Sequence, residues 1–417
     1  MTAAIGSVLM PSPADGPWTG FSLAERDRRW RSVRENAAKA GFDCTFVPLC
    51  VDGRNLHLSL EQARGTRSDI RYLTQLENAA IAIPTDGRSP IVITQRGEGN
   101  SWVTEPRRAG PGWFPSWGQA MADALMELGM DRARIGVSGL KGGKVTHGRA
   151  LDGVVNHTAY AETKRRLPNA TFEDATDVVG FARYMKGDEE IAALKRGAAI
   201  AQAGIDEMVR VARPGMNAGV LYARVMRRML ELGSEYYPLA WRISTIGGPA
   251  PRYEEAPYWI QLDSMDVVAP EVDAVWGGLV AQEMQPILLG RVPEQLKPVI
   301  QLQRDVFQAG LEYMKPGTLF GDLIDFINGF GAKRGMRTII LMHGRGYGND
   351  GPLLTPGDIS ADHFRDVPIQ KANAWVWKPT AFSADGKLQF SFGGVTIVDD
   401  DGGHLVTGRT PGMIEVV

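Results

Sequence analysis

Two stretches of this chain, 213–233 and 315–335, carry the same spacing of residues. Each starts with a basic residue and Pro-Gly, has a second glycine four positions after the first, and ends on a glycine 19 positions after the proline, with a helical run between. Their separation of 102 residues is longer than a solenoid unit of about 20 to 50 residues. The pattern predicts one domain made of two related halves with its site where they meet, although Pro-Gly pairs also recur in turns by chance.

The composition narrows the class of protein. A length of 417 residues allows two or three domains, each large enough to bury its own core. Hydrophobic residues make up 44% and charged residues 23%, which is typical of a globular chain. The net charge of −2 comes without a basic block or an RNA-type aromatic motif, so we expect no nucleic-acid partner.

The cysteines and the N-terminal segment indicate in which cellular compartment the protein is expected. Cys44 and Cys50 are the only cysteines and fit neither a disulfide framework nor a zinc ligand set, so we expect buried, reduced thiols. Residues 1–20 are rich in Pro and Gly and lack the basic start of a signal peptide, which predicts a flexible arm. No apolar run approaches the roughly 20 residues that span a bilayer. We therefore expect a cytoplasmic protein that does not act at a membrane.

From residue 21 to residue 166, helix signals alternate with strand signals. A helix is expected at 23–41, with Ser22 as its N-cap and Glu25 completing a capping box. Strands are expected at 44–50, 69–76, 79–83, 90–94 and 135–137, and a second helix at 117–129. This alternation predicts an α/β domain, followed by a connector at 167–174.

Residues 175–417 predict runs of helices beside runs of antiparallel strands, as in an α+β domain. A long amphipathic helix is expected at 187–211, and the two Pro-Gly stretches supply two more helices. A further helix is expected at 294–314 and a glycine-turned hairpin within 266–290. The other strands are expected at 240–247, 258–262, 338–342, 373–377 and 388–398.

Several segments together resemble one known superfamily. They are both Pro-Gly helices and the segments 69–74, 183–191, 265–268 and 341–346. The chain resembles the creatinase, prolidase and aminopeptidase P superfamily, which has the pita-bread fold. The resemblance implies a creatinase-like N-terminal domain over 21–166 and a pita-bread catalytic domain over 175–417 with an internal two-fold repeat. It also implies a homodimer in which the N-terminal domain of one subunit borders the active site of the other.

Metallopeptidases of this superfamily hold two metal ions with two Asp, one His and two Glu. The carboxylates neutralise the ions, which activate a bridging hydroxide. Carried over by spacing from the adjoining motifs, four of these positions fall on Glu271, Gln282, Lys378 and Phe392 or its glycine neighbours. A neutral amide, a cation and a phenyl ring are unsuitable ligands, so we expect neither metal nor another cofactor.

The histidine position leaves alternatives open. The peptidase ligand can align with Tyr347, whereas in the dimethylsulfoniopropionate lyases of the superfamily the His-Gly-x-Gly histidine binds iron, which is His343 here. Asp273 would then serve as a second acidic ligand, but the set still lacks three carboxylates. Creatinase works without metal, although its loop histidine has no counterpart in 247–255, so the resemblance does not imply creatine hydrolysis.

Charged residues in apolar strands are the main site candidates. Glu271 lies in the apolar stretch 267–275, where a carboxylate marks either a site or a structural ion pair. Asp273 shares its face by two-residue alternation, where two adjacent carboxylates would suit acid/base work, or else it faces solvent at the hairpin mouth. Lys378 follows Trp375-Val-Trp. We expect it either to fill the metal space and pair with Glu271 or Asp273, or to be a surface lysine.

A glycine-rich turn supplies the remaining candidates. His343 opens the sequence His-Gly-Arg-Gly-Tyr-Gly and is the best acid/base candidate among six histidines. Arg345 and Tyr347 are expected to orient a substrate carboxylate, and Asp350 to orient or cap the turn. Further candidates for the pocket wall are Gln282, Arg242, Arg252 and Tyr253.

These observations predict a metal-independent, creatinase-type hydrolase or lyase. It would cleave a C–N or similar C–heteroatom bond of a small polar metabolite, with zwitterions included, by acid/base catalysis. The catalytic residues would be His343, Glu271 and Asp273, and Lys378, Gln282, Arg345 and Tyr347 would hold the substrate. The alternatives are a metal-dependent Xaa-Pro peptidase-like or dimethylsulfoniopropionate-lyase-like enzyme, and a non-catalytic pita-bread binding protein.

Overall fold

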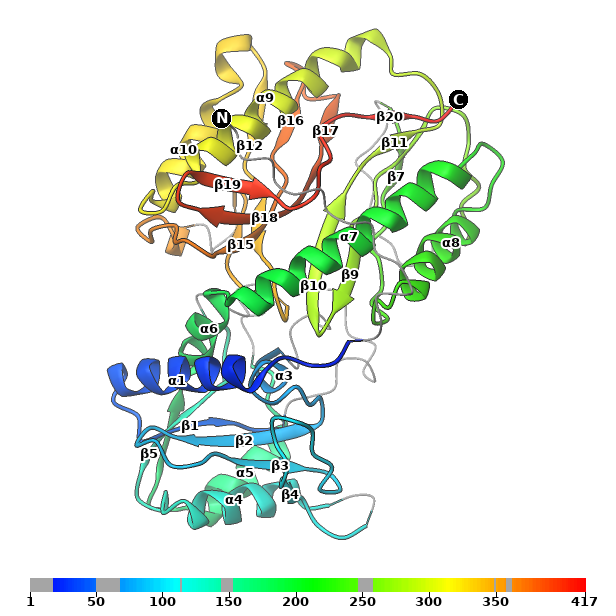
Figure 1. The fold of residues 1–417 in the computed structure, drawn as a ribbon. Helices are drawn as coiled ribbons and strands as arrows, with labels where there is room; N and C mark the ends of the chain where they lie inside the picture. Colours follow the sequence, from blue (N-terminus) through cyan, green and yellow to red (C-terminus); the bar gives the residue numbers. More distant parts are fainter. Residues whose placement is uncertain are drawn as a thin grey trace. The chain divides into compact units, whose positions relative to one another are not determined.

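The computed structural model describes residues 18–49, 68–112, 115–143, 153–246, 258–348, 350–357 and 362–417. Contacts divide the chain into two compact units, coloured along the sequence in Figure 1. The N-terminal unit comprises Thr19–Met185 and the short segment Tyr347–Pro352. The C-terminal unit comprises Lys186–Gly346 and Leu353–Val417, together with Trp18.

The N-terminal unit is built on a six-stranded mixed sheet with the order β4-β3-β2-β1-β5-β6. Its strands are β1 (Cys44–Val47), β2 (Ala79–Pro84), β3 (Ile91–Thr94), β4 (Arg107–Arg108), β5 (Arg134–Val137) and β6 (Thr171–Asp174). Its helices are α1 (Leu23–Lys39), α3 (Ser68–Thr74), α4 (Trp117–Glu127), α5 (His157–Arg166) and α6 (Thr176–Tyr184). Figure 1 shows α1, α3 and α6 on one side of the sheet and α4 and α5 on the other.

Two expectations for this unit were wrong. The segment 69–76 is not a strand but helix α3, and the side chain of Thr74 donates a 2.6 Å hydrogen bond to the carbonyl of Ile70 within it. A short apolar run cannot be assigned to helix or strand by periodicity alone. The expected connector at 167–174 contains β6, which pairs in parallel with β5, so the N-terminal unit continues through α6.

The C-terminal unit contains three sheets. Their orders are β14-β13-β15-β18-β10-β9 with β19 beside β18, then β20-β11-β8-β7, and then β12-β16-β17. The strands of the first sheet are β9 (Val272–Trp276), β10 (Leu279–Met284), β13 (Met342–Gly344), β14 (Leu353–Leu354), β15 (Ala374–Trp377), β18 (Gly393–Asp399) and β19 (Gly402–Leu405). The others are β7 (Ile243–Thr245), β8 (Asp266–Val268), β11 (Ile287–Leu288), β12 (Arg337–Ile339), β16 (Thr380–Phe382), β17 (Gln389–Ser391) and β20 (Ile414–Glu415).

Three strand expectations in this unit need correction. The segment 258–262 contributes only an isolated bridge between Gln261 and Asn217. The expected strands at 338–342 and 388–398 are each divided between two sheets, as β12 with β13 and β17 with β18. Apolar alternation does not show where a strand leaves one sheet for another, because both parts keep a buried face.

Helices cover one face of the seven-stranded sheet. Helix α7 (Asp188–Val211) crosses β9 and β10 in Figure 1, and helices α8 (Ala218–Glu231), α9 (Lys297–Tyr313) and α10 (Phe320–Gly329) follow. A Cβ atom at Gly197 of α7 would lie 2.9 Å from the Cβ of Ala281, and one at Gly310 of α9 only 2.2 Å from the ring of Trp377. Glycine therefore lets these helices approach the sheet closely.

The two Pro-Gly stretches share their local backbone conformation. Gly215 and Gly317 have φ angles of +80° and +91° in the turns before α8 and α10. Gly233 and Gly335, which close the stretches, have φ angles of +89° and +63°. These left-handed conformations explain the glycines at matching positions. A common origin of the two halves remains a hypothesis.

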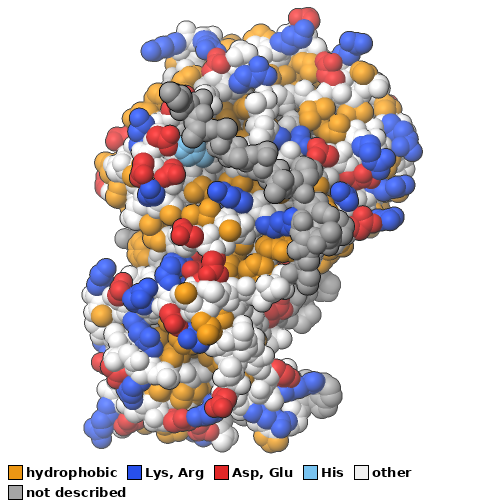
Figure 2. Space-filling view, in the orientation of Figure 1, with side chains coloured by type: hydrophobic (Ala, Val, Ile, Leu, Met, Phe, Trp, Pro, Cys, Tyr) orange, Lys and Arg blue, Asp and Glu red, His pale blue; other side chains and the backbone are white. Residues whose placement is uncertain are grey.

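The surface of the C-terminal unit carries charges of both signs. Figure 2 shows acidic, basic and hydrophobic side chains mixed over the face in view. Around α8, Arg210 is paired with Glu207 at 2.7 Å and Arg227 with Glu231 at 2.7 Å. Neighbouring charges therefore partly cancel there, and such solvent-screened pairs contribute little to stability.

Two further expectations concern the membrane and the thiols. No helix among the described residues has both the length and the apolar character needed to cross a bilayer.

Cys44 is a buried free thiol whose pKa is raised by burial to about 12, which suits an unreactive core residue. Cys50 lies outside the described residues.

The buried carboxyl group of Glu283 predicts how the stability of the protein depends on pH. Its carboxyl group accepts hydrogen bonds from the Val395 N–H and the Thr407 hydroxyl, both at 3.2 Å, and burial raises its pKa to about 8. Between the unfolded pKa and this value the folded state holds a proton that the unfolded state releases. Stability should therefore fall as pH rises from about 5 to 8, by up to roughly 1.4 kcal/mol per pH unit.

Urea unfolding of the wild type and of Glu283→Gln across this pH range checks the prediction. The variant should lose most of the slope, because an amide carries no titrating proton. Glu162→Gln is the control, since the exposed Glu162 carboxyl has a pKa lowered to about 2 by hydrogen bonds from Arg165 and Arg166. An unchanged slope in Glu283→Gln would contradict the assignment.

Candidate active site

Alternation along β9 and β10 places three candidate side chains on one face of the seven-stranded sheet. Asp273 of β9 stands directly opposite Gln282 of β10. Glu271 precedes Asp273 by two residues and so shares its face, and its N–H donates a 2.8 Å hydrogen bond to the Ala240 carbonyl. Ala274 and Ala281, which contact α7, point to the opposite face. The three polar side chains thus lie on the face that α7 does not cover.

Strands β13 and β15 bring three more candidates to this same face. His343 pairs with Val376, and the N–H of Lys378 donates to the Leu341 carbonyl at 3.0 Å, which continues the ladder. The N–H of Arg345 likewise donates to the Ala374 carbonyl at 3.1 Å. Strand β18 joins the two groups of strands, because its Gly394 is opposite both Trp377 and Glu283.

Their side chains form a continuous set of polar contacts, which we call the charge network: Glu271, Lys378, Gln282, Asp273 and Arg345. The Lys378 ammonium is ion-paired with the Glu271 carboxylate and lies 3.5 Å from the Gln282 carbonyl oxygen. The Gln282 amide nitrogen donates to Asp273 at 3.5 Å, and Arg345 donates to the other Asp273 oxygen at 3.3 Å. All five residues are buried.

Burial explains why the charges occur in pairs. An unpaired charge in a protein interior costs several kcal/mol, which a partner of opposite sign offsets. Here two cations face two carboxylates, and Gln282 bridges them through both ends of its amide. The two carboxylates therefore interact with cations, and Asp273 does not face solvent at the hairpin mouth.

This set of residues does not fit two divalent metal ions. Lys378 and Arg345 place positive charge beside the carboxylates that a metal would need. Across the described parts of the chain, no group of three or more His, Cys, Asp or Glu side chains is gathered for metal binding. The donor chemistry at this face is that of an ion-pair network.

One carried-over position needs correction. The ring of Phe392 lies 5.4 Å from that of Phe307, a residue of α9, and so packs in the helix-covered core. Its neighbour Gly393 stands on the candidate face, where an added Cβ would lie 2.4 Å from the Cβ of Lys378. Glycine there leaves the space that the lysine stem occupies, so no side chain can be added without displacing Lys378.

His343 lies beside the charge network on the neighbouring strand. It is 2% exposed, and its Nδ1 lies 3.4 Å from the Gly344 carbonyl oxygen. Because His343 faces Val376, Lys378 is its diagonal neighbour, at about 7–8 Å between Cα atoms. A substrate or water bound between them would bring both within reach of one reacting group.

Two candidates, Tyr347 and Asp350, make contacts in the N-terminal unit. The Tyr347 hydroxyl accepts a 3.1 Å hydrogen bond from Arg29, and Asp350 is ion-paired with Arg183 in the N-terminal unit. Asp350 also accepts from the Tyr347 N–H at 3.0 Å, as expected of a turn cap. The structure therefore gives both residues contacts inside the N-terminal unit, where buried Arg183 needs a carboxylate partner. Arg252 and Tyr253 lie outside the described residues.

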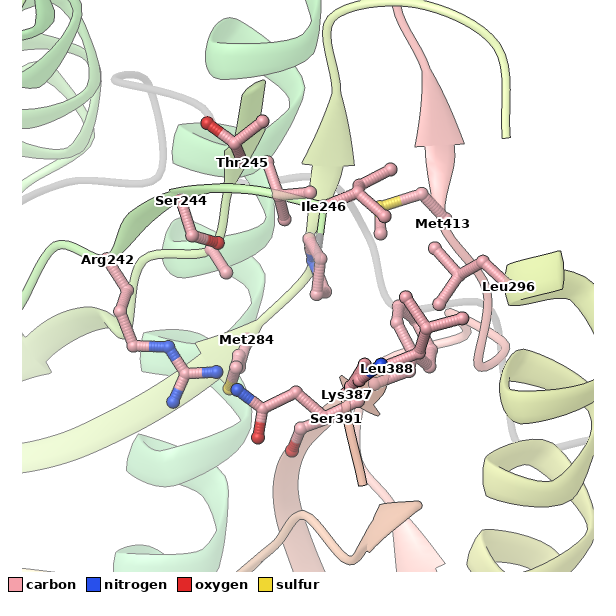
Figure 3. A pocket seen from close by; sticks show the side chains of 15 residues that line it. Arg242, Ser244, Thr245, Ile246, Met284, Leu296, Lys387, Leu388, Ser391 and Met413 are labelled. Carbon is pink, nitrogen blue, oxygen red and sulfur yellow. The ribbon is translucent and has the colours of Figure 1, made fainter. Parts of the chain in front are cut away.

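A pocket adjoins the charge network within the C-terminal unit, and Arg242 is one of its lining residues (Figure 3). Met284 links the two, because it follows Gln282 by two residues and stands opposite Gly393. Ser391 is a second link, since its hydroxyl donates to the Lys378 carbonyl at 3.2 Å. Neither residue was singled out from the sequence, although two-residue alternation from Gln282 would have indicated Met284.

Comparisons with known proteins agree with this fold. Residues 192–401 match the sequence model of metallopeptidase family M24. Methionine aminopeptidase 1 of Dictyostelium discoideum is 24% identical over 58% of this chain and 71% of its own length. An uncharacterized hydrolase/peptidase of Sinorhizobium fredii is 27% identical over 38% of this chain, but the chain spans only 42% of that relative. The crystal structure of X-Pro aminopeptidase from Thermotoga maritima matches with a TM-score of 0.70 at 15% identity, covering 92% of this chain and 98% of that one.

The Lys378–Glu271 pair generates a stability prediction. Lys378→Met should lower the free energy of unfolding by about 3–5 kcal/mol, because it leaves a buried carboxylate without its cation. The double variant Lys378→Met/Glu271→Gln should recover most of this loss. Chemical denaturation of the wild type, both single variants and the double variant gives the coupling energy.

The exposed pair Lys297 and Glu294 supplies the control, since its side chains are 56% and 87% exposed. Lys297→Met should cost less than about 1 kcal/mol. If the Lys378→Met and Glu271→Gln losses simply added, the two side chains would not act as a pair.

Proposed function

This chain belongs to metallopeptidase family M24, and from that membership we propose that it is a hydrolase that works without a two-metal centre. The hydrolytic class is supported by the family and by its similarity to named peptidases and hydrolases. Metal independence is supported by one observation. Lys378 and Arg345 are paired with Glu271 and Asp273 on the candidate face.

In this proposal, fixed cations take the electrostatic role that divalent ions have in a metallopeptidase. Preorganised positive groups stabilise the oxyanion that forms when water adds to a carbonyl-type carbon. Lys378 and Arg345 would supply that charge, and the carboxylates of Glu271 and Asp273 would hold them in place. Gln282 would fix the spacing between the two pairs.

His343 would move the protons of the reaction. It would accept a proton from the attacking water, whose oxygen bonds to the substrate carbon. It would then donate that proton to the leaving nitrogen as the C–N bond breaks. Water is the only co-reactant in this hydrolysis. The same base could instead remove a proton from carbon, which would make the reaction an elimination.

The charge network supports a proposal for the substrate class. A face with both cations and carboxylates suits a small polar molecule, with zwitterions included, better than a large apolar one. We further propose that the chain acts as a homodimer, as the superfamily it resembles commonly does, and that it needs neither nucleic acid nor a membrane surface.

A metal-dependent Xaa-Pro peptidase-like enzyme is the alternative, and the fold match to an X-Pro aminopeptidase favours it. It requires Lys378 to leave Glu271 so that a cation can enter. A dimethylsulfoniopropionate-lyase-like enzyme with His343 and Asp273 as ligands requires the same movement. In a non-catalytic binding protein, the second alternative, His343 would have only a structural role.

Metal analysis separates these proposals. Protein purified without chelator should contain manganese, iron, zinc and cobalt well below one ion per chain. A panel of Xaa-Pro dipeptides and small C–N compounds should show turnover that neither EDTA nor added Mn²⁺ changes. Near-stoichiometric metal together with activity that EDTA abolishes would overturn metal independence in favour of the peptidase.

His343→Ala should lower kcat on any substrate so found by about 10²–10⁴-fold. His404→Ala is the matched control, because His404 is exposed and its Nε2 lies 2.7 Å from Asp401. His404→Ala should leave kcat unchanged. Equal rates for the His343→Ala variant and the wild type would remove His343 from the reaction.

A further inference from the structure

The pocket beside the charge network is lined by two edge strands. Strand β7 is the last strand of the sheet β20-β11-β8-β7, and β17 is the last strand of the sheet β12-β16-β17. Ser244 of β7 and both Gln389 and Ser391 of β17 line the pocket. We propose that this pocket binds an uncharged aliphatic amide, in which a carboxamide group carries a hydrocarbon chain of about three carbon atoms. The inference rests on the proposed function and deepens it, because it names a substrate class for the same site.

The charged side chains of the pocket wall do not offer a free charge. Among the described residues that line the pocket, the only charged ones are Arg242 and Lys387. Lys387 is ion-paired with Asp385 at 3.7 Å, and Arg242 also has an interaction partner. A charged ligand would therefore lose its hydration without gaining an unpaired opposite charge. An uncharged ligand does not incur this cost.

Two neutral side chains of the pocket can bind a ligand through hydrogen bonds. The Ser244 hydroxyl and the Gln389 side-chain amide form no hydrogen bond with any other residue that the structure describes. Because the Gln389 amide has both a donor and an acceptor, it can pair with a carboxamide through two hydrogen bonds. A carboxylate lacks the donor and an ammonium group lacks the acceptor. This pairing favours an amide over either ion.

The other end of the pocket is apolar and small. Figure 3 shows Arg242, Ser244 and Ser391 at one end, and at the other it shows Ile246, Leu296, Leu388 and Met413. The cavity volume is about 60 Å³, which is room for about four to six groups of the size of a water molecule. A carboxamide with a three-carbon chain has about this size. Each methylene group that leaves water for the apolar end should tighten binding about fourfold, until the cavity is full.

The polar end is the one nearer the charge network. The Arg242 carbonyl accepts a 2.8 Å hydrogen bond from the Ala269 N–H, two residues before Glu271. The Ser391 hydroxyl donates to the Lys378 carbonyl at 3.2 Å and keeps its lone pairs for a ligand N–H. An amide held at this end therefore lies closer to the network than its hydrocarbon chain does. Its C–N bond is the bond that the proposed hydrolysis would cleave.

NMR spectra of the full-length protein with ¹³C-labelled methionine methyl groups test the assignment. Met284 and Met413 line the pocket, and Met121 in the core of the N-terminal unit is the internal control. Butanamide should shift the signals of Met284 and Met413, which Met284→Leu and Met413→Leu identify, and leave the Met121 signal unchanged. Butanoate and butylammonium should bind at least about fivefold more weakly, because each loses one of the two hydrogen bonds. No shift at Met284 and Met413 would overturn the assignment.

The length of the hydrocarbon chain tests the size of the cavity. Butanamide should bind about sixteenfold more tightly than acetamide, because it buries two more methylene groups. Octanamide should bind no more than about twofold more tightly than butanamide, because its additional methylene groups remain in water. A steady gain with each methylene group up to octanamide would contradict a cavity of this size.

Gln389→Glu tests the hydrogen-bonding group. The variant should bind butanamide at least about fivefold more weakly, and it should bind butylammonium more tightly than the wild type does, because a carboxylate replaces the amide. Gln119→Glu is the matched control, since Gln119 is an exposed glutamine of α4 that does not line the pocket. It should leave both affinities unchanged. Unchanged butanamide binding in Gln389→Glu would remove the amide from the proposal.

Binding and catalysis are judged separately by these measurements. Equal affinity for butanamide, butanoate and butylammonium would overturn the pocket assignment whatever the metal content of the protein. Selective amide binding in a protein with stoichiometric metal and EDTA-sensitive activity would instead overturn the metal-independent hydrolase and leave the pocket assignment standing.

Discussion

The buried ion pair between Lys378 and Glu271 is the interaction on which the rest of the candidate site depends. A lysine and a glutamate can share a protein interior only when each satisfies the other. Their pairing fixes the carbonyl end of Gln282, whose amide end then meets Asp273. Arg345 is the last member of this series of contacts, because its guanidinium donates a hydrogen bond to Asp273. Positive charge thus lies beside the carboxylates that a metal centre would need as ligands, and this observation is the basis of the proposed chemistry with fixed charges.

Strand β18 makes this arrangement physically possible through two consecutive glycines. Gly393 lies on the candidate face, where the stem of Lys378 occupies the space of a side chain. Gly394 lies on the helix-covered face, where an added Cβ would be 2.1 Å from the Glu283 carboxyl group. Each glycine accommodates a long polar side chain from a neighbouring strand, one on each face of the sheet. Gly393 and Gly394 therefore leave room for one ion pair and one buried carboxyl group.

Much of the fold could be predicted because its signals are local. The expected helices at 23–41, 117–129 and 187–211 occur within a few residues of α1, α4 and α7. The Glu25 N–H donates to the Ser22 hydroxyl, as the cap predicted, but the Glu25 carboxylate bonds to Arg28 and Arg29 and does not complete the capping box. The spacing of Ser22 and Glu25 does not show that nearby arginines compete for the Glu25 carboxylate. The helix at 68–74 was mistaken for a strand because a short apolar run fits either structure.

By itself the sequence determined which residue types were available for the candidate site and on which strand faces they would fall. Two-residue alternation put Glu271 with Asp273, and spacing from motifs indicated Gln282 and Lys378. Only the tertiary structure decided which of these side chains meet, because the β9–β10 hairpin is far in the chain from β13, β15 and β18, and the two groups are joined through sheet order. It also assigned Tyr347 and Asp350 to the N-terminal unit, although they directly follow the glycine-rich turn. Contacts between distant segments depend on packing and charge compensation, which no local pattern records.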